Sequence, residues 1–229
     1  MKPISICRTT LNYKTNQRYI SSQQFRGAFI DYIRTHFTQK QQEKLPMHLA
    51  FNKDKNGKQL TRYSQIQYKI DTNQLEIIAI GKSEKIVDLW LKKVLKNNDF
   101  SINGKVLSIT KPEKNNHFWY PELQEPKLYK IQNWCPFNSQ SVGDETQFDK
   151  IIWGNMHRML SDLNIKFSQK VTISILEKKK RKQPYKGYDV AWISYDILFS
   201  TNINLPQHLG IGHIVSLGAG KITKVKQIL

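Results

Sequence analysis

Apolar and polar residues follow two different periods along the first 110 positions of the chain. Four short stretches have the alternation or the composition of β-strands: residues 2–11, 62–71, 75–80 and 105–110. Two longer stretches, after Ser21 and after Ser83, repeat apolar residues at intervals of three and four, which predicts amphipathic helices. Ser21 and Gln24 have the spacing of a capping box, and the helix that follows extends to about His36. The element order is therefore β-α-β-β-α-β, the ferredoxin-like unit.

The second half of the chain repeats part of this order. Four strands are predicted there: residues 127–132, 171–177, 190–200 and 221–228. A helix is predicted over 144–163, and a glycine-rich region takes the place of a second helix. We therefore expect an α+β fold of two tandem ferredoxin-like (βαββαβ) halves, the second modified by a glycine-rich loop. The expected domains are 1–112 and 126–229, joined by a Pro- and Glu-bearing linker over 113–125.

The chain carries far more positive than negative charge. Its 229 residues include 36 Lys and Arg against 18 Asp and Glu, a formal net charge of +18. This excess favours a polyanionic partner, because solubility alone needs much less. No run reaches the roughly 18 apolar residues of a membrane-spanning helix, and the N-terminus lacks the pattern of a secretory signal. Cys7 and Cys135 stand alone, without a CxxC pair, which favours a reduced, cytoplasmic setting.

Glycines concentrate near the end of the chain. Four of the eleven lie within eleven residues, as two Gly-x-Gly pairs. One interpretation is a phosphate-binding loop, because glycine lets backbone N–H groups approach an anion. That prediction covers Gly210, Gly212, His213, Ser216, Gly218, Gly220 and Lys221. A nucleotide P-loop is excluded, since Ile222 follows the lysine where Ser or Thr is required. The alternative is a structural turn before a last strand.

A cluster of cations lies in the connection between the strands predicted at 171–177 and 190–200. It consists of Lys178, Lys179, Lys180, Arg181 and Lys182. Such runs are often solvated hairpin tips. In a chain of this charge we favour the second interpretation, an arm that grips phosphate. Tyr185 and Tyr188 then either stack on unpaired bases or anchor the hairpin.

The run over 199–222 closely resembles a family of known proteins. It contains Asn202-Ile-Asn-Leu-Pro206, then Gly210-Ile-Gly212, then Ser216-Leu-Gly218-Ala-Gly220. This pattern is similar to the CRISPR-associated endoribonucleases of the sixth Cas protein family, in the b-type branch of the RAMP superfamily. Two N-terminal segments match as well: Arg26-Gly27-Ala28 and Arg62-Tyr63-Ser64-Gln65-Ile66-Gln67-Tyr68-Lys69.

The resemblance implies tandem ferredoxin-like folds, repeat-RNA binding and metal-independent cleavage without a cofactor. In that chemistry the ribose 2′-OH attacks the adjacent phosphate and leaves a 2′,3′-cyclic phosphate and a 5′-OH. The reaction needs a base for the 2′-OH, an acid for the leaving oxygen and cations for the transition state. The sequence has no clustered Asp, Glu and His set for a metal, and Arg26 is carried over as an RNA contact.

The expected catalytic triplet departs from the family pattern. Related enzymes have His-Asn-His where this chain has Phe51-Asn52-Lys53, and one tyrosine is replaced by Thr61. His48, three residues before Phe51, is the leading candidate for the imidazole. Further catalytic candidates are Lys44 and Lys53 as cations, Tyr63 as a phosphate-orienting residue, and His36 as a second imidazole. For His36 a packing role is the favoured alternative, since it follows the apolar face of its helix.

The sequence therefore predicts a CRISPR repeat-RNA endoribonuclease. A non-catalytic guide-RNA-binding protein of the same fold is the first alternative, favoured by the missing histidines. A general basic RNA-binding protein is the second. The partners expected are repeat or guide RNA, with a CRISPR effector complex or a second copy of the chain as further candidates.

Overall fold

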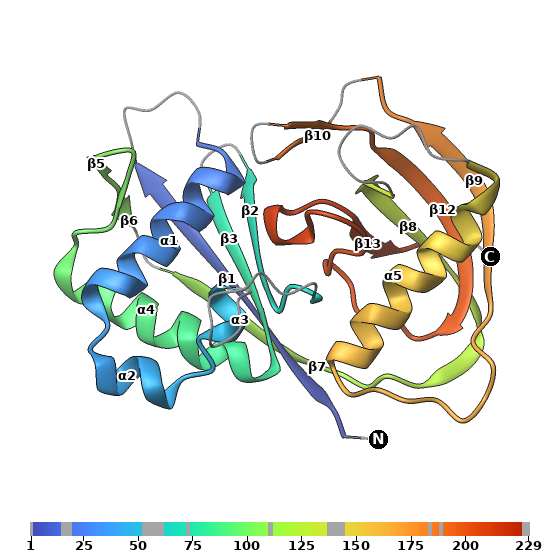
Figure 1. Ribbon diagram of the computed structural model, residues 1–229, viewed down its shortest axis with the longest axis horizontal. Coiled ribbons are helices and arrows are strands. Elements are labelled where there is room, and N and C mark those ends of the chain that lie inside the picture. The colour runs from blue at the N-terminus through green and yellow to red at the C-terminus, as the bar shows by residue number, and fades with distance from the viewer. Residues whose placement is uncertain are drawn as a thin grey trace. The chain divides into compact units, whose positions relative to one another are not determined.

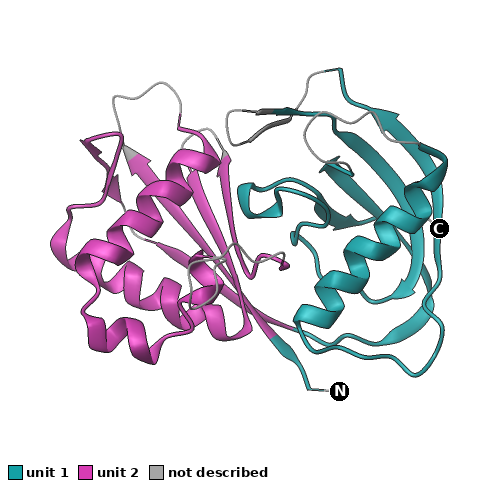
Figure 2. Cartoon of the chain, viewed as in Figure 1, with its two compact units in different colours: residues 1–4, 119–229 teal, residues 5–118 magenta. Residues whose placement is uncertain are grey.

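The computed structural model describes residues 2–14, 20–51, 62–71, 74–109, 112–136, 145–182, 185–187 and 190–225 (Figure 1). The chain divides into two compact units (Figure 2). Unit 2 contains residues 5–118, and unit 1 contains residues 119–229 together with 1–4. The described residues contain no helix that is long and apolar enough to cross a membrane.

Unit 2 is built on an antiparallel sheet in the order β2-β3-β1-β6, with β7 also pairing β1. The strands are β1 (Ile4–Lys14), β2 (Ile66–Asp71), β3 (Gln74–Ile80), β6 (Ser108–Ile109) and β7 (Glu113–Trp119). The hairpin β2-β3 thus lies on one side of β1 and the last strands on the other. This is the strand order that the β-α-β-β-α-β pattern predicts.

Two long helices cover the core of unit 2, α1 (Ser22–His36) and α4 (Glu84–Asn97). The predicted capping box is present: Gln24 N–H donates to the Ser21 hydroxyl at 3.2 Å, and Ser21 N–H donates to the Gln24 side chain at 2.9 Å. The helices and β2 meet through edge-on and tilted aromatic contacts among Phe25, Phe29, Tyr68, Trp90 and Phe100.

The polar stretch after α1 contains two short helices that the apolar pattern does not predict. They are α2 (Gln39–Lys44) and α3 (His48–Phe51). Thr38 and Gln41 form a capping box at the start of α2. The strand expected over 105–110 is also split, because β5 (Lys105–Val106) pairs with β4 (Ser101–Ile102) while β6 pairs with β1.

The sequence predicts a linker over 113–125, and the structure corrects this prediction. β7 occupies 113–119 and pairs with β1, and the next strand begins at Leu123. β6 pairs only with Tyr13 and Lys14, so the remaining edge of β1 accepts a further partner. The sequence gives no strand signal for β7, because six of its seven residues are exposed and its polar residues do not alternate with apolar ones.

Unit 1 is built on an antiparallel sheet in the order β13-β8-β12-β9. Its strands are β8 (Leu123–Trp134), β9 (Ile173–Lys180), β12 (Tyr195–Ile203) and β13 (Lys221–Lys224). Helix α5 (Phe148–Asp162) packs on this sheet through edge-on contacts of Phe148 with Trp134 and Tyr195. The expected strand over 190–200 is two strands, since β11 (Val190–Trp192) pairs with β10 (Tyr185–Gly187) in a separate ribbon.

The prediction of an α+β protein with two antiparallel sheets and helices is confirmed. In unit 1 the chain runs from β12 to β13 through the glycine-rich segment 204–220, which contains the short 3-10 helix η3 (Val215–Leu217). No long helix lies in that described segment, as the sequence indicates.

Candidate functional site

The glycine-rich segment 204–220 is packed into unit 1. Its backbone is bonded within the segment, where Ile211 N–H donates to Gly220 O at 2.9 Å. It is also bonded to the end of β8 and the residue after it, since Gly220 N–H donates to Asn133 O and His213 N–H to Cys135 O, both at 3.1 Å. Its aliphatic side chains are buried: Leu205, Leu209, Ile211, Val215 and Leu217. The segment therefore serves as apolar cover for the sheet as well as a connection.

Three of its glycines have the space of a side chain filled by the protein itself. A Cβ at Gly220, where φ is +68°, would lie 1.8 Å from Ile211 O. A Cβ at Gly210 would lie 2.6 Å from Ala219 O, and one at Gly212 would lie 2.8 Å from the Trp134 ring. These contacts support the structural alternative at the three positions. A loop that only binds phosphate would let a Gly212→Val protein keep its fold. Because Trp134 occupies the space of the new side chain, we expect this substitution to disturb the fold.

Gly218 has a different role, because it ends η3 at a φ of +92° with its N–H donating to Val215 O at 3.0 Å. Ser216 and Lys221 remain partly exposed. Phosphate binding by this segment stays a prediction. The partly exposed Ser216 and Lys221 are better placed to contact phosphate than the three close-packed glycines.

His213 joins the glycine-rich segment to the β10-β11 ribbon. Its ring stacks on Trp192 of β11, with centroids 5.9 Å apart and planes at 25°. Burial lowers the pKa of the His213 imidazole, and the positive charge of Arg158 on α5 lowers this pKa further. The ring is therefore mainly neutral at pH 7 and adds less positive charge than the sequence suggests.

The basic run is not a loose hairpin tip. Its first three lysines belong to β9, which pairs with β12 up to Lys180. Lys178 Nζ lies 3.4 Å from a Glu145 carboxylate oxygen and 5.5 Å from the centre of the Phe148 ring. Arg181 donates to both carboxylate oxygens of Asp196, at 3.2 and 2.9 Å. Two of the five cations are thus held by carboxylates of unit 1.

The remaining members of the run, Lys179, Lys180 and Lys182, are exposed. Lys178 and Arg181 are exposed as well, but each is paired with a carboxylate, so a phosphate-gripping role rests on the other three. Base stacking by the two tyrosines stays a prediction. Tyr188 lies outside the described residues, and only the backbone of Tyr185 is described, in β10.

The leading catalytic candidates lie on the short helices of unit 2. Lys44 ends α2, His48 begins α3, and both are exposed. Partial burial lowers the pKa of the His48 imidazole, and the positive charge of Arg62 lowers this pKa further. Lys53 lies outside the described residues. The structure therefore places a mainly neutral imidazole beside an arginine.

A further candidate, Tyr63, is less exposed than a phosphate contact requires. Tyr63 is 7% exposed, and its hydroxyl accepts a hydrogen bond from the Gln67 amide at 2.9 Å. Burial raises the pKa of this phenol far above its usual value. A packing role therefore explains Tyr63 better than phosphate orientation. Arg26 lies on α1 and is half-buried.

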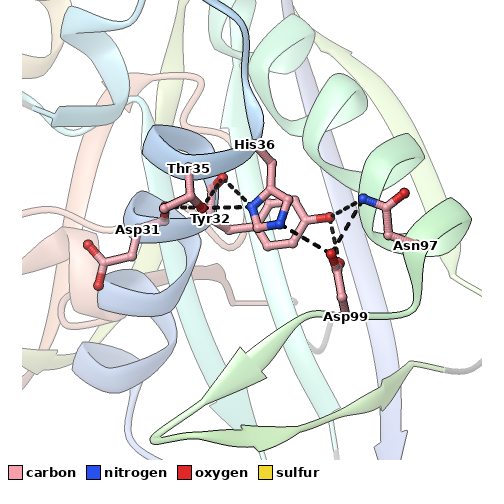
Figure 3. A network of polar contacts seen from close by, with 6 residues as sticks. All are labelled: Asp31, Tyr32, Thr35, His36, Asn97 and Asp99. Atoms are coloured by element: carbon pink, nitrogen blue, oxygen red, sulfur yellow. Dashed lines mark hydrogen bonds and ion pairs between the residues drawn. The ribbon is translucent and has the colours of Figure 1, made fainter.

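His36 forms part of a polar network at the end of α1 (Figure 3). Its ring stacks on Tyr32 at a centroid distance of 3.9 Å. Its Nε2 lies 3.2 Å from an Asp99 carboxylate oxygen, and its Nδ1 lies 3.1 Å from the Tyr32 carbonyl and 2.7 Å from the Thr35 hydroxyl. The Tyr32 hydroxyl donates to Asp99 at 2.7 Å, and Asn97 contacts both.

Both ring nitrogens of His36 are therefore engaged by the protein. This supports the packing role that the helix pattern favours over a catalytic one. The sequence does not reveal Tyr32, Asn97 and Asp99 as partners of this ring. Asp99 follows α4, more than sixty positions from His36, and no local pattern signals that pairing.

The candidate residues fall into two sets. His48, Lys44, Tyr63, His36 and Arg26 belong to unit 2, whereas the glycine-rich segment and the basic run belong to unit 1. Among the described residues, no group of three or more His, Cys, Asp and Glu could hold a metal ion.

Solved structures share this fold over nearly the whole chain. A crystal structure of Cas6b matches with a TM-score of 0.72 and 20% identity, covering 98% of this chain and 100% of that chain. A CRISPR RNA processing endoribonuclease Cas6b matches at 0.60 and 19%, covering 96% and 100%. A Cas6-related protein from Pyrococcus furiosus matches at 0.57 and 10%, covering 99% and 100%. At these identities the likeness shows the fold alone.

A sequence family covers the second half of the chain. Residues 123–225 match the family model of the Cas6b C-terminal domain. This confirms the resemblance predicted from the glycine-rich run. An uncharacterized protein of Methanocaldococcus jannaschii is 32% identical over 85 residues. That match covers 37% of this chain and 56% of the relative, just over half of its length.

Gly220→Ala tests the structural role of the glycine-rich segment. The new methyl group meets Ile211 O at a positive φ, so we expect a loss of unfolding free energy of about 2 kcal/mol or more. Thermal melting followed by circular dichroism measures this loss. Gly154→Ala on α5 is the matched control, because a Cβ there meets nothing within 4 Å and should not destabilise. An unchanged melting temperature with weakened RNA binding would instead support a phosphate loop.

Proposed function

We propose that this protein is a metal-independent endoribonuclease that cleaves CRISPR repeat RNA, built on two tandem ferredoxin-like halves. The observation that carries the proposal is the Cas6b C-terminal domain at 123–225, together with the Cas6b fold over nearly the whole chain. In the proposed reaction the ribose 2′-OH attacks the adjacent phosphorus. The bond to the 5′ oxygen breaks, and the products carry a 2′,3′-cyclic phosphate and a 5′-OH.

His48 is the proposed general base. A base must be unprotonated before it takes the 2′-OH proton, and the lowered pKa of His48 favours this form at neutral pH. Arg62, whose charge acts on His48, is exposed and would stabilise negative charge on the phosphorane. Lys44 and Lys53 remain proposed contributors to the same charge. His36 is a weaker candidate, because both of its ring nitrogens already contact oxygen atoms.

A second candidate function is guide-RNA binding without cleavage. Two observations favour it: Phe51 and Lys53 stand where related enzymes have histidines, and Tyr63 is buried. General RNA binding without CRISPR specificity receives less support, since the match to the Cas6b C-terminal domain covers the glycine-rich segment. Assembly into an effector complex or a homodimer stays a prediction.

Cleavage of repeat RNA in the presence of EDTA distinguishes the two functions. We expect single-site cleavage that EDTA leaves unchanged, with a 2′,3′-cyclic phosphate and a 5′-OH at the new ends. Electrophoresis before and after phosphatase and kinase treatment identifies these ends. Tight binding of intact repeat RNA without any cleavage would favour the binding function. Loss of cleavage in EDTA that magnesium restores would contradict the metal-independent route.

His48→Ala tests the proposed base. We expect the single-turnover rate to fall by about 10²–10⁴ while repeat-RNA affinity is unchanged. The wild-type rate should decline as pH falls through the lowered pKa of His48, because protonation removes the base. Arg62→Gln should move this acid limb to higher pH, since one cause of the lowered pKa is gone. Equal rates for wild type and His48→Ala would remove His48 from the mechanism. His36→Ala serves as the comparison and should change the rate much less.

The salt dependence of RNA affinity tests the lysines of the basic run that are not paired with Asp196 or Glu145. Lys179→Ala with Lys182→Ala should reduce the slope of log affinity against log salt by about 0.7–0.9 for each RNA phosphate that these lysines neutralise in the wild-type protein. The same charge change on α4, Lys92→Ala with Lys96→Ala, is the control. Equal changes in slope for both pairs would show that the basic run has no special contact with RNA.

A further inference from the structure

A cavity of about 720 Å³ lies in unit 1, between α5 and the segment 163–171 that follows it. Leu160 and Ile165 are buried at its base, and Trp153 and Phe167 add aromatic surface. Trp153 is 37% exposed, a large fraction for a tryptophan in a closed core. The volume of the cavity lies within the range of small-ligand sites. None of the candidate site residues described above lines it.

The cavity is preformed rather than an accidental gap. Ile165 N–H donates to Leu160 O at 2.8 Å, so the chain turns back directly at the end of α5. The far end of the segment is tied to β12, because the Asn202 amide donates to Lys170 O at 3.1 Å and its oxygen accepts from Thr172 N–H at 2.9 Å. Both ends of this wall of the cavity are therefore fixed by hydrogen bonds.

The chemistry of the lining favours a nucleotide. Lys166 and Lys170 supply positive charge, and no Asp or Glu is among the lining residues. Asn164 and Gln169 offer amide donors and acceptors for the edge of a base. Trp153 supplies a flat surface on which an unpaired base stacks.

We propose that this cavity binds one unstacked nucleotide of a single-stranded RNA segment, with the base against Trp153 and its phosphate near Lys166 and Lys170. The inference rests on the proposed function for its choice of RNA. A lipid or an acidic peptide fits less well, because neither uses a stacking surface together with base-edge amides. The cavity thus extends RNA contact to the C-terminal half of α5.

Photo-crosslinking locates the bound nucleotide on the wild-type protein. Decauridine with one 4-thiouridine is irradiated with the full chain, and the attached peptide is identified by mass spectrometry. We expect attachment within residues 153–171. Uridine 5′-monophosphate is the competitor. It shows whether the cavity takes a free nucleotide or a nucleotide within an RNA strand. Displacement at micromolar concentration would assign the cavity to a free nucleotide and overturn the RNA assignment. Attachment only outside these residues would overturn the proposal altogether.

Substitutions of Trp153 and Lys166 test how much these side chains contribute to RNA affinity. Trp153→Ala should weaken decauridine binding by about 5- to 150-fold, and Trp153→Phe should retain most of the affinity. Lys166→Ala should reduce the salt slope by about 0.7, while Lys150→Ala, on α5 but outside the cavity lining, should not. The two lysine substitutions should leave the melting temperature unchanged, and Trp153→Ala is compared with wild type at a temperature where both are folded. Equal affinities of wild type and Trp153→Ala, or equal slopes for the two lysine variants, would overturn the proposal.

Binding in the cavity and cleavage of repeat RNA can be tested separately. Decauridine is not repeat RNA and need not be cleaved. Normal repeat cleavage with no crosslink at 153–171 would remove the cavity from RNA binding and leave the endoribonuclease in place. A crosslink there in a protein that never cleaves repeat RNA would support the cavity and remove the catalytic proposal.

Discussion

The backbone contact between Gly220 and Ile211 is the constraint on which unit 1 depends. The described part of this unit has one long helix, α5, on its sheet, and the glycine-rich segment supplies the rest of the apolar cover. Chain segments approach this closely only where no Cβ intervenes. The same contact region includes Trp134, which packs against both Gly212 and Phe148 of α5. The segment, the sheet and α5 are therefore one packed unit, and His213 and Lys221 take their positions from it.

This constraint explains why the sequence alone left two interpretations of the glycines open. A phosphate loop and a close-packed turn both need small residues and positive φ, so the same residues predict both. The outcome depends on which atoms lie where a Cβ would be, and one of these atoms belongs to Trp134 of β8, far from Gly212 in the sequence. Strands and long helices were predictable because their periods are local. β7 was not, since it is held by pairing with β1 across about a hundred residues of chain.

The candidate active site shows the same division between local and distant information. The positions of His36 and His48 follow from the sequence, but their surroundings do not. His36 is engaged by Asp99, and Tyr63 is buried against Gln67, although the sequence alone makes both of them candidates for contact with RNA. Alternation in 62–71 fixes which residues share a face, yet it does not say which face is covered. Arg62 acts on His48 because α3 and the start of that stretch approach each other in space.

Ion pairs within unit 1 determine which cations near β9 remain available to the phosphates of an RNA. Asp196 is held by Arg181, and Glu145 by Lys178, so two carboxylates close to the basic run are each paired with a cation. Exposed pairs of this kind contribute little to stability, because water screens them. Their effect is positional: they leave Lys179, Lys180 and Lys182 exposed without a competing negative charge from Asp196 or Glu145. Since phosphate affinity grows with each counterion released, a polyanion at β9 would draw its affinity mainly from these three lysines.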